Sequence, residues 1–129
     1  MAIQKINQSF CATIKGNYKD VISLSAKNGL SDKYIKHSLA EIHKACPNAE
    51  DKVYLYYRDV YKTGFFSSNV YLGKRCGIKV AKDGEVLELN INPNTVKAKY
   101  LLPLMALRVK QLVSGEVEPD ENPKFKVYR

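Results

Sequence analysis

Lysine, arginine and tyrosine residues gather in the middle of the chain, between residues 52 and 82. This segment contains seven basic residues and one acidic residue, with seven aromatic side chains among them. Cations hold phosphates and flat rings stack on unpaired bases, so the combination is typical of a surface that binds nucleic acid. In the simpler alternative, the rings belong to the core and the cations are the solvent-facing side chains of the same strands. The candidate phosphate contacts in this segment are Arg58, Lys74, Arg75, Lys79 and Lys82.

Residues suited to catalysis or metal binding are few and badly placed. The two histidines, His37 and His43, are six residues apart on a predicted helix, which separates them by about 120° around its axis. Glu85 and Glu88 would point to opposite faces of a predicted strand. No phosphate-binding glycine loop, HExxH or GxSxG motif occurs. The sequence therefore predicts no catalytic residue, no metal site and no cofactor.

One enzymatic alternative remains. Small basic ribonucleases, such as bacterial toxins of the RelE type, combine helices with an antiparallel sheet, and some cleave RNA without a metal. Cationic and tyrosine side chains activate the 2′-hydroxyl and neutralise the transition state in such a mechanism. By this analogy, which rests on fold class and on no motif, the roles would fall to Arg58, Tyr71, Lys74 and Arg75.

Two helices are predicted before the basic segment. The first starts after Asn17 and ends at Asn28-Gly29, and the second runs from Ser31 to Pro47 with an apolar stripe. The junction resembles a helix-turn-helix, in which a glycine turn precedes a capped second helix that enters the DNA major groove. Ser25 and Ser38 depart from that pattern, and a plain αα-hairpin is the alternative. The candidate nucleic-acid contacts on the second helix are Lys33, Lys36, His37 and Lys44.

The remaining elements predict an α+β fold with a central antiparallel sheet. Residues 3–15 fit a helix or a strand, residues 53–61 and 70–72 read as strands, and residues 78–82 and 85–91 form a hairpin around an Asp-Gly turn. A last helix spans 96–113, where Pro103 should kink or split it. We expect one domain at 1–115, followed at 116–129 by an acidic, proline-containing linker and a tail that is either frayed or an added edge strand.

Size and composition fit a single globular domain. The chain has 129 residues and a net charge of +8, and no apolar run approaches the roughly 18 residues that a membrane span needs. Three widely spaced cysteines without a CxxC motif favour a reducing compartment, so we expect a cytoplasmic protein. The sequence favours a DNA- or RNA-binding protein without catalysis. A module that docks an acidic or nucleic-acid-handling protein is an alternative, because both partners select a cationic, tyrosine-rich surface.

Overall fold

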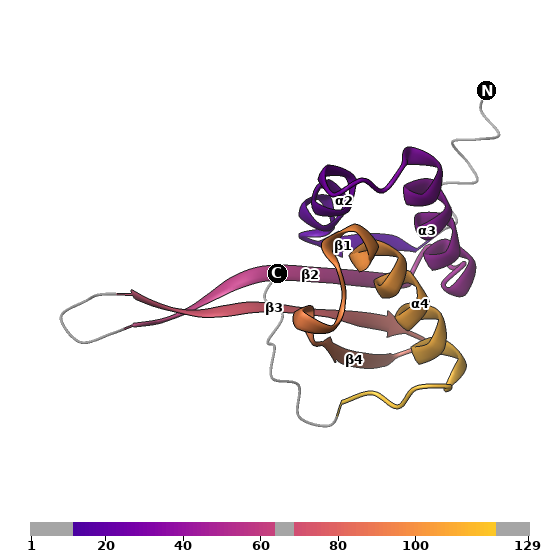
Figure 1. Cartoon of the computed structure of the whole chain (residues 1–129). Coiled ribbons are helices and arrows are strands. Elements are labelled where there is room, and N and C mark those ends of the chain that lie inside the picture. Colours follow the sequence, from indigo (N-terminus) through magenta and orange to yellow (C-terminus); the bar gives the residue numbers. More distant parts are fainter. Residues whose placement is uncertain (1–11, 64–68, 121–129) are drawn as a thin grey trace.

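In the part of the chain that the structure describes, three helices cover one face of a four-stranded sheet (Figure 1). The structure, a computed structural model, describes residues 12–63 and 69–120. The elements follow in the order β1 (Thr13–Gly16), α2 (Tyr18–Lys27), α3 (Asp32–Ala45), β2 (Lys52–Thr63), β3 (Asn69–Lys82), β4 (Glu85–Ile91), η2 (Pro93–Thr95), η3 (Ala98–Tyr100) and α4 (Leu101–Ser114). The expected α+β fold is confirmed.

The sheet is mixed rather than antiparallel. Its order is β1-β2-β3-β4, and β1 pairs with β2 in parallel, whereas the other two pairings are antiparallel. The predicted central strands, β2, β3 and β4, are antiparallel as expected. β1 adds a parallel edge because α2 and α3 form a crossover that returns the chain in its original direction. Asn17 lies at the N-cap position of α2, but its side chain does not cap the helix. Instead, the Asn17 side chain donates a hydrogen bond to Tyr57 O and accepts one from Tyr57 N–H, with 2.9 Å between Tyr57 N and Asn17 Oδ1. These two hydrogen bonds continue the β1–β2 pairing by one step.

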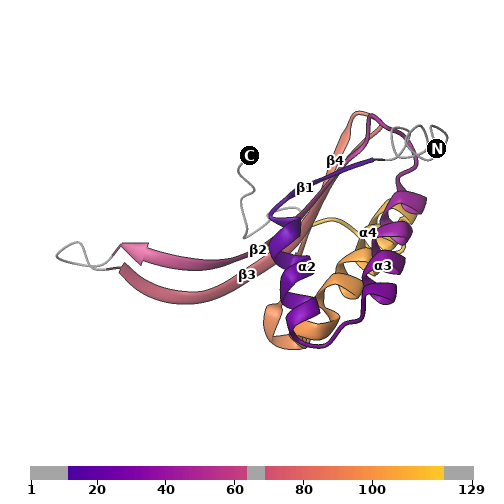
Figure 2. The same ribbon diagram turned by 90° about the horizontal axis from the view of Figure 1, so that it is seen from above.

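β2 and β3 form a hairpin that is much longer than the sequence suggested. The predicted short strand at 70–72 and the strand at 78–82 are parts of one strand, β3. A register shift between Val60 and Tyr61 interrupts the pairing, and Gly73, opposite Val60, has a φ of 112°. β1 pairs with β2 only as far as Leu55, and β4 pairs with β3 only from Cys76 onward. The paired residues beyond both limits, 58–63 and 69–75, project past the helices, and we call them the arm (Figures 1 and 2).

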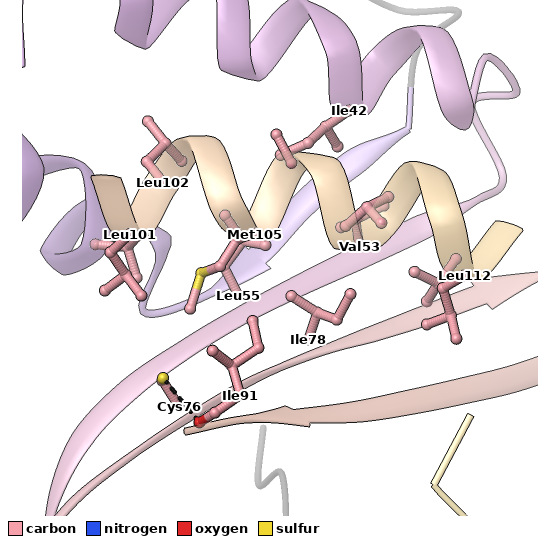
Figure 3. Packing of buried hydrophobic residues seen from close by; sticks show 14 of the residues in the cluster. Ile42, Val53, Leu55, Cys76, Ile78, Ile91, Leu101, Leu102, Met105 and Leu112 are labelled. Carbon is pink, nitrogen blue, oxygen red and sulfur yellow. Dashed lines mark hydrogen bonds between the residues drawn. The ribbon is translucent and has the colours of Figure 1, made fainter. Parts of the chain in front are cut away.

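The core lies between the sheet and α4. Met105 points from α4 toward Leu55 of the sheet, and Ile42 of α3 lies on the far side of α4 (Figure 3). Pro103 neither kinks nor splits α4, because it is the third residue of that helix, where a backbone N–H has no intrahelical acceptor. The predicted 96–113 helix is divided earlier, between η3 and α4.

α2 and α3 have nearly the predicted bounds, but the helix-turn-helix pairing is not confirmed. α3 packs mainly on α4, and α2 packs on β2 and η3. Ser25 and Ser38, the two serines that depart from the helix-turn-helix pattern, are both buried. Ser25 Oγ donates a hydrogen bond to Ala98 O (3.0 Å) and accepts one from Leu102 N–H (3.2 Å), whereas Ser38 Oγ donates to Tyr34 O within α3. The glycine junction thus connects two helices that each pack chiefly on other elements.

The chain after α4 returns to the sheet. Val117 N–H donates to Gln111 O, and Asp120 N–H donates to Glu88 O at 2.8 Å. The Asp120 carboxylate also accepts a hydrogen bond from Asn90 N–H at 2.7 Å. The first part of the segment predicted as a linker therefore lies against β4. The predicted tail at 124–129 and residues 3–11 of the ambiguous first segment fall outside the described residues. In the part of the chain that the structure describes, no helix has the length and apolar character to cross a bilayer.

Candidate nucleic-acid interface

The structure distributes the nine predicted contact residues over three places. Successive residues of a strand point to opposite faces, so the strand register decides which cations share a surface. The face turned away from the helices, here the outer face, receives Arg58, Arg75 and Lys79. The helix-covered inner face receives Lys74 and Lys82. The remaining four, Lys33, Lys36, His37 and Lys44, lie on α3 in the helix layer (Figure 2).

On the outer face, two arginines lie directly opposite each other. Arg58 of β2 and Arg75 of β3 are register partners, and both are exposed. Like charges at directly opposed positions destabilise a sheet. Lys79 lies on the same face, four residues after Arg75 on β3. Its Nζ lies 5.3 Å from the centroid of the Tyr54 ring. Lys15 of β1 is the register partner of Tyr54, and so it adds a further cation beside it. Glu88 of β4 is the register partner of Lys79 and brings a negative charge to the same face. The positive charge is therefore concentrated on the side of the outer face that holds Lys15, Arg58 and Arg75.

Tyr54 and Tyr56 separate these cations. Their rings are stacked, with centroids 6.0 Å apart and an interplanar angle of 5°, and they form a cluster distinct from the main core. They are only 2% and 6% exposed, so these two rings offer no surface on which a base could stack. The expectation of base stacking is therefore not met at this position. A cavity of about 650 Å³ beside them is lined by residues 13–18 of the chain together with Tyr54, Tyr56 and Arg58.

The inner face of the arm carries a polar and aromatic cluster. Lys74 Nζ lies 3.1 Å from Asp59 Oδ1 and 5.2 Å from the centroid of the Tyr57 ring. Tyr71 Oη donates to the same Asp59 oxygen at 3.0 Å, and its ring meets that of Tyr61 edge to face at 5.4 Å. The hydrogen bond from Lys74 lowers the pKa of the Asp59 carboxyl, and the same bond raises the pKa of Lys74. Tyr61 and Tyr71 are more than half exposed, so the accessible rings of the sheet belong to the arm.

This geometry bears directly on the ribonuclease alternative. Its four residues do not converge, because Arg58 and Arg75 lie on the outer face whereas Tyr71 and Lys74 lie on the inner face. The Asp59 carboxylate also holds the Tyr71 hydroxyl and the Lys74 ammonium. The structure thus offers no common point at which this set would reach one phosphodiester.

Lys82 has a structural partner. Its Nζ lies 2.9 Å from Asp51 Oδ2, with the aspartate side chain 4% exposed and the lysine side chain 20% exposed. The hydrogen bond to Asp51 raises the pKa of Lys82. The pair joins the end of β3 to the residue that precedes β2, so this cation neutralises a buried charge rather than projecting from the hairpin tip.

The α3 cations form a separate and partly neutralised surface. Lys36 pairs with Asp32 at 3.0 Å, and His37 lies 3.9 Å from Glu41. Lys33 and Lys44 are exposed. Because α3 belongs to the layer that covers the inner face, these residues cannot contact a ligand together with Arg58, Arg75 and Lys79 unless that ligand wraps around the domain (Figure 2).

The cysteines and possible metal ligands add no second centre among the described residues. Cys46 and Cys76 are free and buried, and burial raises the pKa of each thiol to about 11. In residues 12–63 and 69–120, no three His, Cys, Asp or Glu side chains gather as a metal site would require. Comparison with known protein families, characterised proteins and solved structures found nothing that matches this chain.

Sequence reasoning missed two features of this interface. Lys15 was not predicted because its segment fitted a helix as well as a strand, and its place on the outer face depends on the parallel pairing with β2. The division of Lys74 from Arg75 follows from strand alternation, and it could have been predicted once both were known to lie inside one strand.

Proposed function

We propose that this protein binds nucleic acid through the cations of its outer face, without catalysis. The observation that carries the proposal is the gathering of basic side chains on one face of the sheet, at Arg58, Arg75, Lys79 and Lys15. A phosphate bound on this face would accept charge-assisted hydrogen bonds from its guanidinium and ammonium groups. Lys15 extends the positive surface onto β1, and Lys79 lies on the same face with Glu88 as its register partner on β4.

The proposed contacts are to phosphates rather than to bases. Arginine presents donors in a planar fork that matches phosphate geometry, whereas the two tyrosines between the cations are buried. Binding of this kind depends little on sequence, and its affinity falls steeply with salt as counterions are released. The free thiols of Cys46 and Cys76 are compatible with the cytoplasmic location that we also propose.

The test is a fluorescence anisotropy titration with labelled duplex DNA, single-stranded DNA and hairpin RNA at about 50 mM and about 200 mM salt. The informative variant is Arg75→Glu/Lys79→Glu on the outer face. Its matched control is Lys33→Glu/Lys44→Glu, which makes the same change in net charge on α3. Arg75, Lys33 and Lys44 are exposed, whereas Lys79 is half-buried and its ammonium lies over the Tyr54 ring. Circular dichroism and urea unfolding would therefore verify that each variant keeps its fold.

We expect the outer-face variant to lose at least about tenfold in affinity, and the slope of log affinity against log salt on duplex DNA to fall by about 0.9 per lost contact. The α3 control should bind nearly as wild type. The reverse pattern would transfer the contact to α3 and contradict the proposal. Failure of the wild-type protein to bind all three probes at low salt would also contradict it, and would leave an acidic protein partner as the reason for the charge.

A further inference from the structure

A cavity of about 500 Å³ lies in the helix layer, where the α2–α3 junction meets the chain that enters α4 (Figure 2). Its aromatic and apolar walls include Tyr34 of α3, Tyr100 of η3 and Pro103 of α4. Lys99 also lines it, with its Nζ 5.4 Å from the centroid of the Tyr100 ring. The carbons of the Lys99 side chain lie 3.9 Å from the position that a Cβ on Gly29 would take. The cavity, which we call the helix-side recess, thus combines two aromatic rings with an ammonium group.

The apolar surface of the recess is exposed and extends past its rim. Tyr34 is 58% exposed and Tyr100 is 49% exposed. Leu107 lies one helical turn after Pro103 on α4 and is 46% exposed. Apolar surface of this kind marks an interaction site, and tyrosines that line a pocket are typical hot spots of protein interfaces. A small molecule in the recess would leave Leu107 uncovered, so the whole surface fits a segment of another protein better.

The charge around the recess indicates the chemistry of that segment. No acidic side chain is among the described residues that line it, whereas Lys99 does line it and Lys33 is exposed next to Tyr34. The neighbouring acid, Asp32, is paired with Lys36 at 3.0 Å. No ion pair between described residues includes Lys33 or Lys99. A complementary segment therefore carries carboxylates. A nucleic acid fits less well, because its chain of phosphates requires a row of cations rather than an ammonium beside an apolar recess.

We infer that the helix-side recess binds a segment of an acidic protein, which places a large apolar side chain between Tyr34 and Tyr100 and carboxylates against Lys33 and Lys99. A second copy of this chain is a poor occupant, because its net charge is +8. The recess belongs to the helix layer, on the opposite side of the sheet from the outer face. The inference therefore goes beyond the proposed function and does not depend on it.

The probe for this site is obtained by selecting phage-displayed random peptides on the wild-type protein. The enriched peptides should share a large apolar residue flanked by Asp or Glu. One such peptide, synthesised with a fluorescent label, should bind at least about tenfold more weakly to Tyr34→Ala and to Lys99→Glu, as expected for a hot spot and for a reversed charge at the contact. Binding should also weaken with salt and on replacing the peptide's acids by their amides.

Matched variants control for general effects of ring loss and charge reversal. Tyr61→Ala removes a tyrosine of equal exposure, 57%, from the arm, and Lys19→Glu reverses an exposed charge in the first turn of α2, at the other end of that helix from Gly29. Both controls should bind the peptide as the wild type does. Circular dichroism and urea unfolding would verify that all four variants keep their fold.

Three results would overturn the inference. The selection enriches no acidic peptide with a large apolar residue, or either Tyr34→Ala or Lys99→Glu binds the peptide as tightly as the wild type. In the third, the two variants lose affinity for the labelled DNA or RNA and retain it for the peptide, which would assign the recess to nucleic acid. The peptide measurements contain no nucleic acid, so the first two results leave the proposed function standing.

Discussion

Replacing Ser25 by alanine tests the interaction that joins the first described helix to the last. The hydroxyl is completely buried, donates to Ala98 O at 3.0 Å and accepts from Leu102 N–H at 3.2 Å. Leu102 is the second residue of α4, and Tyr100, at the N-cap, provides no side-chain cap. The N–H of Leu102 is one of the first four of the helix, which have no intrahelical acceptor, so Ser25 caps α4 from a distant part of the chain.

The expected loss follows from what alanine leaves behind. A buried donor without a partner costs about 1–3 kcal/mol. The carbonyl of Ala98 still accepts a hydrogen bond from Leu101 N–H, so its loss of Ser25 adds little. Ser25→Ala should therefore lower the free energy of unfolding by about 1–3 kcal/mol, at least as much as the roughly 1 kcal/mol typical of an ordinary N-cap. Urea unfolding followed by circular dichroism measures this value, and Ser23→Ala, an exposed position on the same helix, is the control. A loss below about 0.5 kcal/mol would refute the capping role.

Two further predictions concern stability. Gly29 has a φ of 103°, and the nearest atom that an added Cβ would meet is 3.9 Å away, so Gly29→Val should cost more than about 1 kcal/mol from backbone strain alone; an unchanged urea midpoint would contradict this. Lys82→Met strands the buried Asp51 carboxylate and should cost about 3 kcal/mol at neutral pH. Asp51 raises the pKa of Lys82 in the folded protein above its usual value of 10.5. The Lys82–Asp51 pair therefore makes its full contribution to the free energy of unfolding below pH 10.5, and that contribution is lost as the pH rises through the pKa of Lys82 in the folded protein. Unfolding measured from pH 7 to 11 should show that loss in the wild type and not in Lys82→Met.

Local patterns predicted the elements whose signals are contained in a few residues. The hairpin of β3 and β4 was predicted from its alternation and its Asp83-Gly84 turn, and both turn residues have positive φ. The α2–α3 junction was also predicted, since Gly29 supplies the conformation that ends a helix. In these cases, the residues that decide the structure are neighbours in the sequence.

The features that were missed depend on distant partners. The segment Gly73-Lys74-Arg75-Cys76-Gly77 shows no alternation, so nothing in it predicts that β3 continues from 69 to 82. The strand persists because β2 pairs with it throughout, and Gly77 is required because an added Cβ would lie 2.8 Å from Leu89 O. Ser25 illustrates the same limit, because its role is visible only once α4 lies beside α2. The sequence therefore predicted which types of residue form the candidate surface. Their division between the two faces of the sheet could be assigned only once the strand register was known.

Asp120 bears on how the molecule behaves at high concentration. An edge strand offers unpaired backbone groups to any other chain, and natural proteins cover such edges to avoid aggregation. The backbone and the carboxylate of Asp120 occupy two of these groups on β4, at Glu88 and Asn90, and bring a negative charge to that edge. The acidic segment that the sequence predicts as a linker thus blocks the addition of another strand to the edge of β4. A chain shortened to end at Gly115 would retain all the described helices and strands and still become prone to self-association along β4.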